Sequence, residues 1–174
     1  MAEPREFDPR KILAALDRHH VSYVLIGGLA RVLRGTDEVT DGVDICPSVR
    51  PGDLGALAGA LDELGARRAD RKRVTLDEQT LLDEPVMRLR TSSGVLQLVA
   101  EPAGTRRGYV DLRRASTVEH IGHGLRPRVA SVADLARMSS ALGRERDLDR
   151  SRELRRIMEL ELGLHRRRGR ERTL

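Results

Sequence analysis

The sequence predicts an α/β (α+β) fold in which a mixed β-sheet is flanked by helices and the carboxyl-terminal end is helical. Two observations predict it. Short β-prone apolar runs alternate with segments whose apolar residues recur at helical spacing, and helical patterns follow the last β-prone run. The chain has 174 residues, the size of one ordinary domain. We expect residues 1–163 to form that domain and residues 164–174 to be a basic, solvated tail.

Helices and strands alternate in the first part of the chain. Asp8 before Pro9 is typical of a helix start, because the carboxylate caps free amides and proline fits the first helical position. In the segments that follow, the spacing of apolar residues predicts helix or strand, and glycine or proline marks where each element ends. The expected elements are a helix from Asp8, a strand over Ser22–Ile26, a short helix stopping near Gly35, a strand over Val43–Cys46 ended by Pro47, and a helix capped by Asp53 and ended by Gly65.

The second part of the chain predicts two hairpins and then helices. Thr75 and Glu78 have the spacing of a capping box, and Ser131 with Asp134 is a second helix-start pattern. The two hairpins are predicted by β-prone runs that flank glycine-containing turns. The expected elements are a short helix at Thr75–Glu78, a hairpin of 86–90 and 95–100, a helix over about 105–114, a hairpin of 118–121 and 125–129, a helix from Ser131 through Met138, and a last helix through Leu160.

Composition limits the partners that this chain can have. The formal net charge of +5 makes polyanions plausible partners, although a solvated arginine-rich surface is the simpler explanation. With no Trp, one Phe and two Tyr, stacking on several bases is a poor mechanism. The single cysteine excludes an intramolecular disulfide. The amino terminus lacks an apolar stretch and no run is long enough to cross a bilayer, so we expect no membrane contact and a cytoplasmic location.

A glycine pair and an acidic strand form the candidate site. Gly27-Gly28 lies between a predicted strand and a helix, where the backbone can approach a polyphosphate and the helix amides favour its charge. In an unrelated fold the same pair would more simply be a tight turn. Asp44 lies on the next predicted strand, just after Thr40 and Asp41. The spacing predicts that the two strands are neighbours in one mixed sheet and that Gly27-Gly28 faces Asp44 across a cleft. Two carboxylates two residues apart on a strand face the same side, where they can hold divalent metal ions.

The segment from Tyr23 to Pro47 resembles the opening of the polymerase-beta-type nucleotidyltransferases, and within them the small bacterial abortive-infection and toxin-antitoxin members. The likeness extends weakly to Asp147 and so covers most of the chain. It implies a nucleotidyltransferase-like sheet, a nucleoside triphosphate ligand, Mg²⁺, and RNA or an antitoxin-like protein as further partners. The candidate residues are Gly27, Gly28, Arg31 and Thr40 for the nucleotide, and Asp44 and Asp41 for catalysis and metal.

Four positions depart from the family pattern. Gly42 stands where the first metal carboxylate is expected, and Asp41 and Asp44 form an i, i+3 pair that a regular strand sends to opposite faces. A bulge at Gly42 would bring the two together. The other departures are Glu38 in place of a basic residue, Gln97 in place of a third carboxylate, and Ser139 near the position of a lysine.

These departures separate two hypotheses for function. The first is a nucleotidyltransferase-fold protein whose transfer activity is weakened or lost and which acts as a nucleotide-, RNA- or protein-binding module. The alternative is an active metal-dependent enzyme that moves a nucleoside monophosphate from a triphosphate to a hydroxyl of RNA or protein. Asp147, near the start of the last helix, could assist a catalytic site, but we expect it to cap the helix or to be a favourable charge at its amino end.

Overall fold

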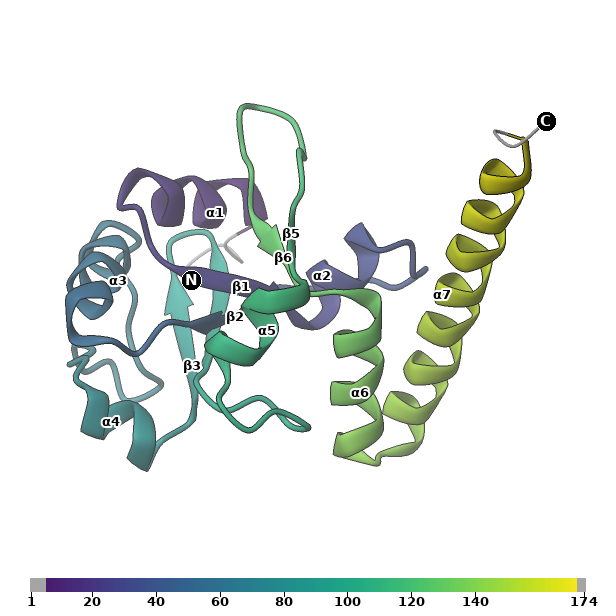
Figure 1. Ribbon diagram of the computed structural model, residues 1–174. Helices are drawn as coiled ribbons and strands as arrows, with labels where there is room; N and C mark the ends of the chain where they lie inside the picture. Colours follow the sequence, from purple (N-terminus) through teal and green to yellow (C-terminus); the bar gives the residue numbers. More distant parts are fainter. Residues whose placement is uncertain (1–5, 172–174) are drawn as a thin grey trace.

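The structure is a computed structural model that describes residues 6–171, with side chains described as far as residue 163. It has a mixed sheet with helices on its two faces and a helical pair at the carboxyl-terminal end (Figure 1). The helices are α1 Pro9–Arg18, α2 Gly27–Leu33, α3 Pro51–Glu63, α4 Glu78–Asp83, α5 Tyr109–Ala115, α6 Val132–Leu142 and α7 Glu145–Glu171. The expected fold class is confirmed.

One sheet contains all six strands of the described chain, in the order β3-β4-β2-β1-β6-β5. The strands are β1 Tyr23–Ile26, β2 Gly42–Pro47, β3 Val86–Thr91, β4 Gly94–Val99, β5 Thr117–Val118 and β6 Arg128–Val129. β1 pairs antiparallel with β2 and parallel with β6, while β2 pairs parallel with β4. Both predicted hairpins are present, but the second one is a ladder of only two residue pairs near its base.

Local sequence explains where α1 begins and why it packs on the sheet. The Asp8 carboxylate accepts hydrogen bonds from the backbone amides of Arg10 and Lys11 at 3.1 and 3.3 Å, as expected for an N-cap. The helix then buries one apolar face against the core. The buried residues of that face are Ile12, Leu13, Ala15 and Leu16.

Three expected helix starts were wrong. α3 begins at Pro51 rather than at Asp53, because proline occupies the first helical position and the Asp53 carboxylate instead accepts a hydrogen bond from Ser48 Oγ at 2.5 Å. The cap of α4 is Asp77, whose side chain accepts from the Thr80 amide, and not Thr75.

The third is α5, which begins at Tyr109 instead of near residue 105. Before it, the Asp111 carboxylate accepts hydrogen bonds from the amides of Arg106 and Arg107 at 3.0 and 2.9 Å. Gly108 then turns with a φ of 47°, a backbone conformation that favours glycine. These contacts fix a turn where the sequence pattern predicted the first helical residues.

The carboxyl-terminal helices form a pair. Ser131 caps α6 by accepting a hydrogen bond from the Asp134 amide, as predicted, and Gly143 ends the helix in the left-handed conformation. α7 packs mainly on α6 and lies at the edge of the molecule remote from α3 (Figure 1). It continues to Glu171, so a helix occupies much of the segment that we expected to be a solvated tail.

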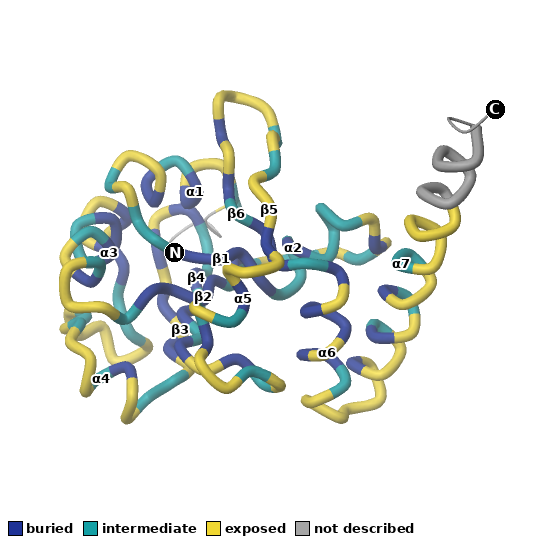
Figure 2. The backbone as a smooth tube through the Cα atoms, in the orientation of Figure 1, coloured by how far each residue is buried: buried dark blue, intermediate teal, exposed yellow. Residues whose placement is uncertain are grey.

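The buried residues concentrate on the sheet and on the surfaces of the helices that cover it (Figure 2). Leu, Ile, Val and Ala dominate this core, as the composition requires. Along residues 6–171, no helix combines the length and the apolar character needed to span a membrane.

Candidate functional site

The glycine turn lies directly against Asp44. β1 and β2 pair so that Ile26 is opposite Asp44, and Gly27 follows Ile26 with a φ of 68°. A Cβ atom at Gly27 would overlap the Asp44 carboxylate. The residue must therefore be glycine on two grounds, its backbone conformation and its lack of a side chain. The sequence prediction that these strands are neighbours and that Gly27 faces Asp44 is confirmed.

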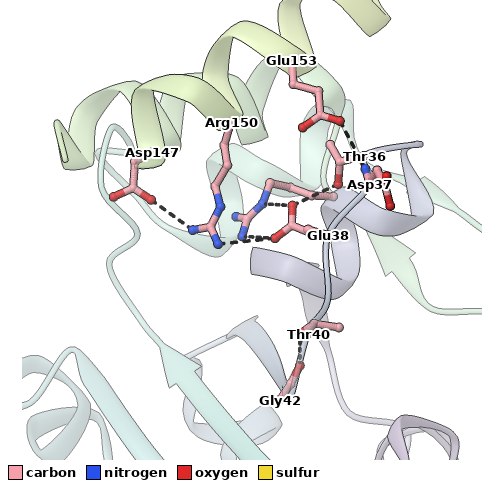
Figure 3. A network of polar contacts seen from close by, with 9 residues as sticks. Thr36, Asp37, Glu38, Thr40, Gly42, Asp147, Arg150 and Glu153 are labelled. Atoms are coloured by element: carbon pink, nitrogen blue, oxygen red, sulfur yellow. Dashed lines mark hydrogen bonds and ion pairs between the residues drawn. The ribbon is translucent and has the colours of Figure 1, made fainter. Parts of the chain in front are cut away.

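Gly28 lies against the segment that leads into β2. A Cβ atom at Gly28 would be 2.9 Å from Thr40 Oγ1, and that hydroxyl donates a hydrogen bond to the Gly42 carbonyl oxygen at 3.0 Å (Figure 3). Gly27, Gly28, Thr40 and Asp44 are thus brought together by the β1–β2 pairing. Asp41 lies in the bend just before β2.

The strand register shows what stands beside Asp44 on the sheet. Asp44 on β2 is opposite Gln97 on β4, and Gln97 is opposite Arg88 on β3. Residues paired in this way project from the same face of a sheet. The face therefore carries one carboxylate, an amide and a guanidinium in a row.

β2 is regular at Gly42. Its residues from Gly42 to Ile45 pair one for one with Val95 to Leu98, so the structure has no bulge that would bring Asp41 onto the face of Asp44. Gly42 is two positions before Asp44 and occupies the same face. A carboxylate is missing at the one position of this strand where it would stand next to Asp44.

Arg31 is already paired with an acid. Its guanidinium donates to both Glu38 oxygens, at 2.8 and 2.9 Å, and only 12% of the Arg31 side chain and 14% of the Glu38 side chain are exposed. Burial alone would raise the pKa of Glu38, but the hydrogen bonds and charge of Arg31, with Thr36 and Arg150, hold it below its ordinary value. The charge that we expected to meet a phosphate is therefore neutralised within the protein.

The same cluster joins α7 to the loop between α2 and β2. Arg150 on α7 lies 3.6 Å from Glu38 and 3.3 Å from Asp147, whose side chain is only 2% exposed (Figure 3). Arg144 donates a further hydrogen bond to Asp147 at 2.6 Å. Asp147 is in the first turn of α7, as expected, but its burial between two arginines was not predicted.

Comparisons with known proteins bear on the fold of the chain. No protein-family model and no curated protein matches the sequence. The solution structure of the antibiotic-resistance factor ANT(2'')-Ia is similar at a TM-score of 0.54 and 18% identity, over 95% of this chain and 93% of that chain. The crystal structure of ANT(2'')-Ia in complex with adenylyl-2''-tobramycin gives a TM-score of 0.56 and 17% identity, over 95% and 97% of the two chains.

ANT(2'')-Ia is an aminoglycoside nucleotidyltransferase with the polymerase-beta-type fold. This chain has a nucleotidyltransferase-like fold. At 17–18% identity the likeness concerns the fold alone.

Asp44 is the only acid within the six described strands of this nucleotidyltransferase-like sheet. Burial raises the pKa of Asp44, the charges of Arg31 and Arg88 oppose the rise, and the charge of Asp41 adds to it. Among residues 6–163, no side-chain hydrogen bond or ion pair involves its oxygens. A desolvated carboxylate without a partner is a group that can accept a proton or a cation.

The donor set does not fit a pair of Mg²⁺ ions. Within the described side chains, no three His, Cys, Asp or Glu residues come together as metal ligands. The neighbours of Asp44 on its face are neutral or positive, and Ser139, near the expected lysine, is buried on α6. Mg²⁺ requires several oxygen ligands from protein, substrate and water. On this face of the described sheet, Asp44 is the one carboxylate that can supply such a ligand.

Proposed function

We propose that this chain is a nucleotidyltransferase-fold binding protein that receives a nucleoside triphosphate at the Gly27-Gly28 turn and has weakened or lost the transfer reaction. The observation that carries the proposal is the row of Asp44, Gln97 and Arg88 across the sheet. A single carboxylate stands where the chemistry of phosphoryl transfer calls for two or three.

The charge requirements of transfer support this proposal. An attacking hydroxyl and a leaving pyrophosphate both need nearby positive charge, which metal ions held by carboxylates supply in this reaction class. Arg31, the residue expected to contact a phosphate directly, is held by Glu38. The turn itself retains the glycine backbone that lets a phosphate approach.

The partners of this module are part of the same proposal. ANT(2'')-Ia, a structural neighbour, has been solved in complex with adenylyl-2''-tobramycin, which supports a nucleotide at the corresponding part of this fold. The resemblance of the Tyr23 to Pro47 segment to small toxin-antitoxin nucleotidyltransferases suggests RNA or an antitoxin-like protein as the second partner. Bacterial defence is the context in which such a module would act.

A second candidate is an active transferase that uses Mg²⁺ and passes a nucleoside monophosphate to a hydroxyl of RNA or protein. One observation favours it: Asp41 is near enough for its charge to raise the pKa of Asp44. A rearrangement of the bend before β2 that turned Asp41 toward Asp44 would give a two-carboxylate site.

Equilibrium dialysis with ATP and Mg²⁺, followed by chromatography of the recovered nucleotide, tests the proposal. We expect saturable binding and recovery of intact ATP. Gly28→Val should remove the binding, because even its Cβ would lie 2.9 Å from Thr40 Oγ1 and the larger side chain would displace Thr40 from the turn. Absence of saturable binding would refute the binding role, while release of pyrophosphate with formation of a nucleotidylated product would favour the second candidate.

A further inference from the structure

A groove rich in arginine lies at the other end of β1 from the Gly27-Asp44 contact. Two hollows of about 590 and 250 Å³ adjoin one another and share Ser22, Tyr109, Arg113 and Arg128 in their walls. We call the joined hollows the arginine groove. Its guanidinium groups come from Arg50, Arg113, Arg114, Arg126 and Arg128.

The arginines come from three separate parts of the fold. Arg50 immediately precedes α3, Arg113 and Arg114 occupy the last turn of α5, and the other two lie on the β5–β6 hairpin. α5 contacts β1 and lies near the base of that hairpin (Figure 1). Pairing of β1 with β2 and β6 therefore gathers positive charge from segments that are far apart in the sequence.

Acids in the walls offset only part of this positive charge. Among residues 6–163, none of the five arginines takes part in an ion pair with Asp or Glu. The two acids in the walls are Asp17 and Asp53, and Asp53 accepts hydrogen bonds from the hydroxyls of Ser48 and Ser22. Arg31 and Arg34 present a contrast, since each is paired with a glutamate.

The groove is distinct from the candidate nucleotide site. Ser22 precedes β1 and Gly27 follows it, so the length of a four-residue strand, roughly 13 Å, separates the two ends. A ligand held by Arg113 and Arg114 would not depend on Asp44 or on the glycine turn.

We propose that the arginine groove binds the phosphodiester backbone of single-stranded RNA. Joined hollows lined by arginines from several elements suit successive phosphates better than one isolated anion, and each planar guanidinium can bind a phosphate through two hydrogen bonds. Tyr109, which is half-buried and lines both hollows, offers one face on which a base can stack. Single-stranded RNA in the arginine groove would be the second partner of the binding module proposed above, and its biological meaning rests on that proposed function.

Fluorescence anisotropy with a short, unstructured RNA tests the groove in the absence of nucleotide. The variant Arg113→Ala/Arg114→Ala removes two exposed guanidinium groups, and Arg146→Ala/Arg156→Ala removes two from the exposed surface of α7. We expect at least a tenfold loss of affinity in the first variant and little change in the second. The plot of log affinity against log salt should become shallower by about 1.4 in Arg113→Ala/Arg114→Ala. Two phosphate contacts are lost, and each contributes about 0.7 to the slope for a single strand.

Three results would overturn the groove assignment: no RNA binding by the natural chain, an equal loss in both double variants, or full displacement of RNA by an equimolar amount of inorganic triphosphate. The last would indicate a site for a small polyphosphate. ATP binding at the Gly27-Gly28 turn is measured on the same groove variant and should be retained. Loss of RNA binding with ATP binding intact therefore separates the groove from the proposed nucleotide site.

Discussion

The backbone of Gly27 lies directly against the carboxylate of Asp44, so the turn after β1 and the acidic strand β2 form a single contact. Gly27 has a positive φ and no space for a Cβ atom. This contact explains why glycine stands at the turn, and it places the only acid on that face of β2 beside the backbone that would meet a phosphate.

Gly27→Ala should destabilise the protein by about 2 kcal/mol or more, because alanine is strained at this φ and its methyl group would collide with Asp44. Gly55→Ala is the matched control. Gly55 lies within α3 with open space around it, and alanine there should be neutral or stabilising by about 0.5–1 kcal/mol. Urea unfolding of both variants is the measurement, and equal stabilities would contradict the contact.

Asp44→Asn should make the folded state more stable than the natural chain at pH 7. Burial raises the pKa of Asp44 above the ordinary value of about 3.9, so the charged form destabilises the folded state wherever the group is ionised. Below the ordinary value the acid is protonated in both folded and unfolded states, and the penalty disappears. The advantage of the variant should therefore shrink as pH falls through the raised pKa.

Urea unfolding at pH 7 and at a series of lower pH values measures this effect. Glu159→Gln, on the exposed surface of α7, serves as a control for removal of a carboxylate. A natural chain that is more stable than Asp44→Asn at pH 7 would show that Asp44 has a stabilising partner.

Gly42→Asp should restore a two-carboxylate face on β2 and strengthen Mn²⁺ binding, by about tenfold or about 1.4 kcal/mol. The new Cβ atom would lie 3.3 Å from the Val95 carbonyl oxygen and 3.4 Å from Val95 Cβ, so a small adjustment admits it. Titration calorimetry should show the gain in Gly42→Asp and not in Gly42→Ala, which adds the same Cβ without the carboxylate. Equal binding by the two variants would count against the metal role of this face.

Glu38→Ala should cost about 1–3 kcal/mol of stability, because it leaves the largely buried Arg31 without its carboxylate. The pKa of Glu38 is below its ordinary value, so its contribution is present at neutral pH and is lost as pH falls through that lowered pKa. Glu153→Ala is the control, since Glu153 contacts the same loop only through the Asp37 amide. The expected order of stability is natural chain, then Glu153→Ala, then Glu38→Ala, and the reverse order for the two variants would refute the role of the pair.

The sequence predicted the parts of the fold that short-range patterns determine. The apolar run before Gly27 and the spacing to Asp44 predicted the β1–β2 pair, and Asp8 and Ser131 predicted two helix starts through their capping side chains. The resemblance implied Gln97 in place of a third carboxylate, and the register places Gln97 opposite Asp44.

The features that the sequence missed depend on competition between neighbours or on contacts between distant segments. Asp53 was a plausible cap, but Pro51 starts the helix and Asp53 binds serine hydroxyls instead. The Glu38–Arg150 contact and the arginine groove join residues that no local pattern relates. Only the tertiary structure could show which arginines are neutralised and which remain free.

Transfer by the purified natural chain tests the central claim most directly. The chain is incubated with each labelled nucleoside triphosphate, Mg²⁺ or Mn²⁺, and a pool of cellular RNA and protein, and the labelling rate is compared with that of Asp44→Ala. The single-carboxylate face predicts that the natural chain labels its acceptors no faster than Asp44→Ala does. Robust, metal-dependent labelling by the natural chain that Asp44→Ala abolishes would contradict the account and establish an active transferase.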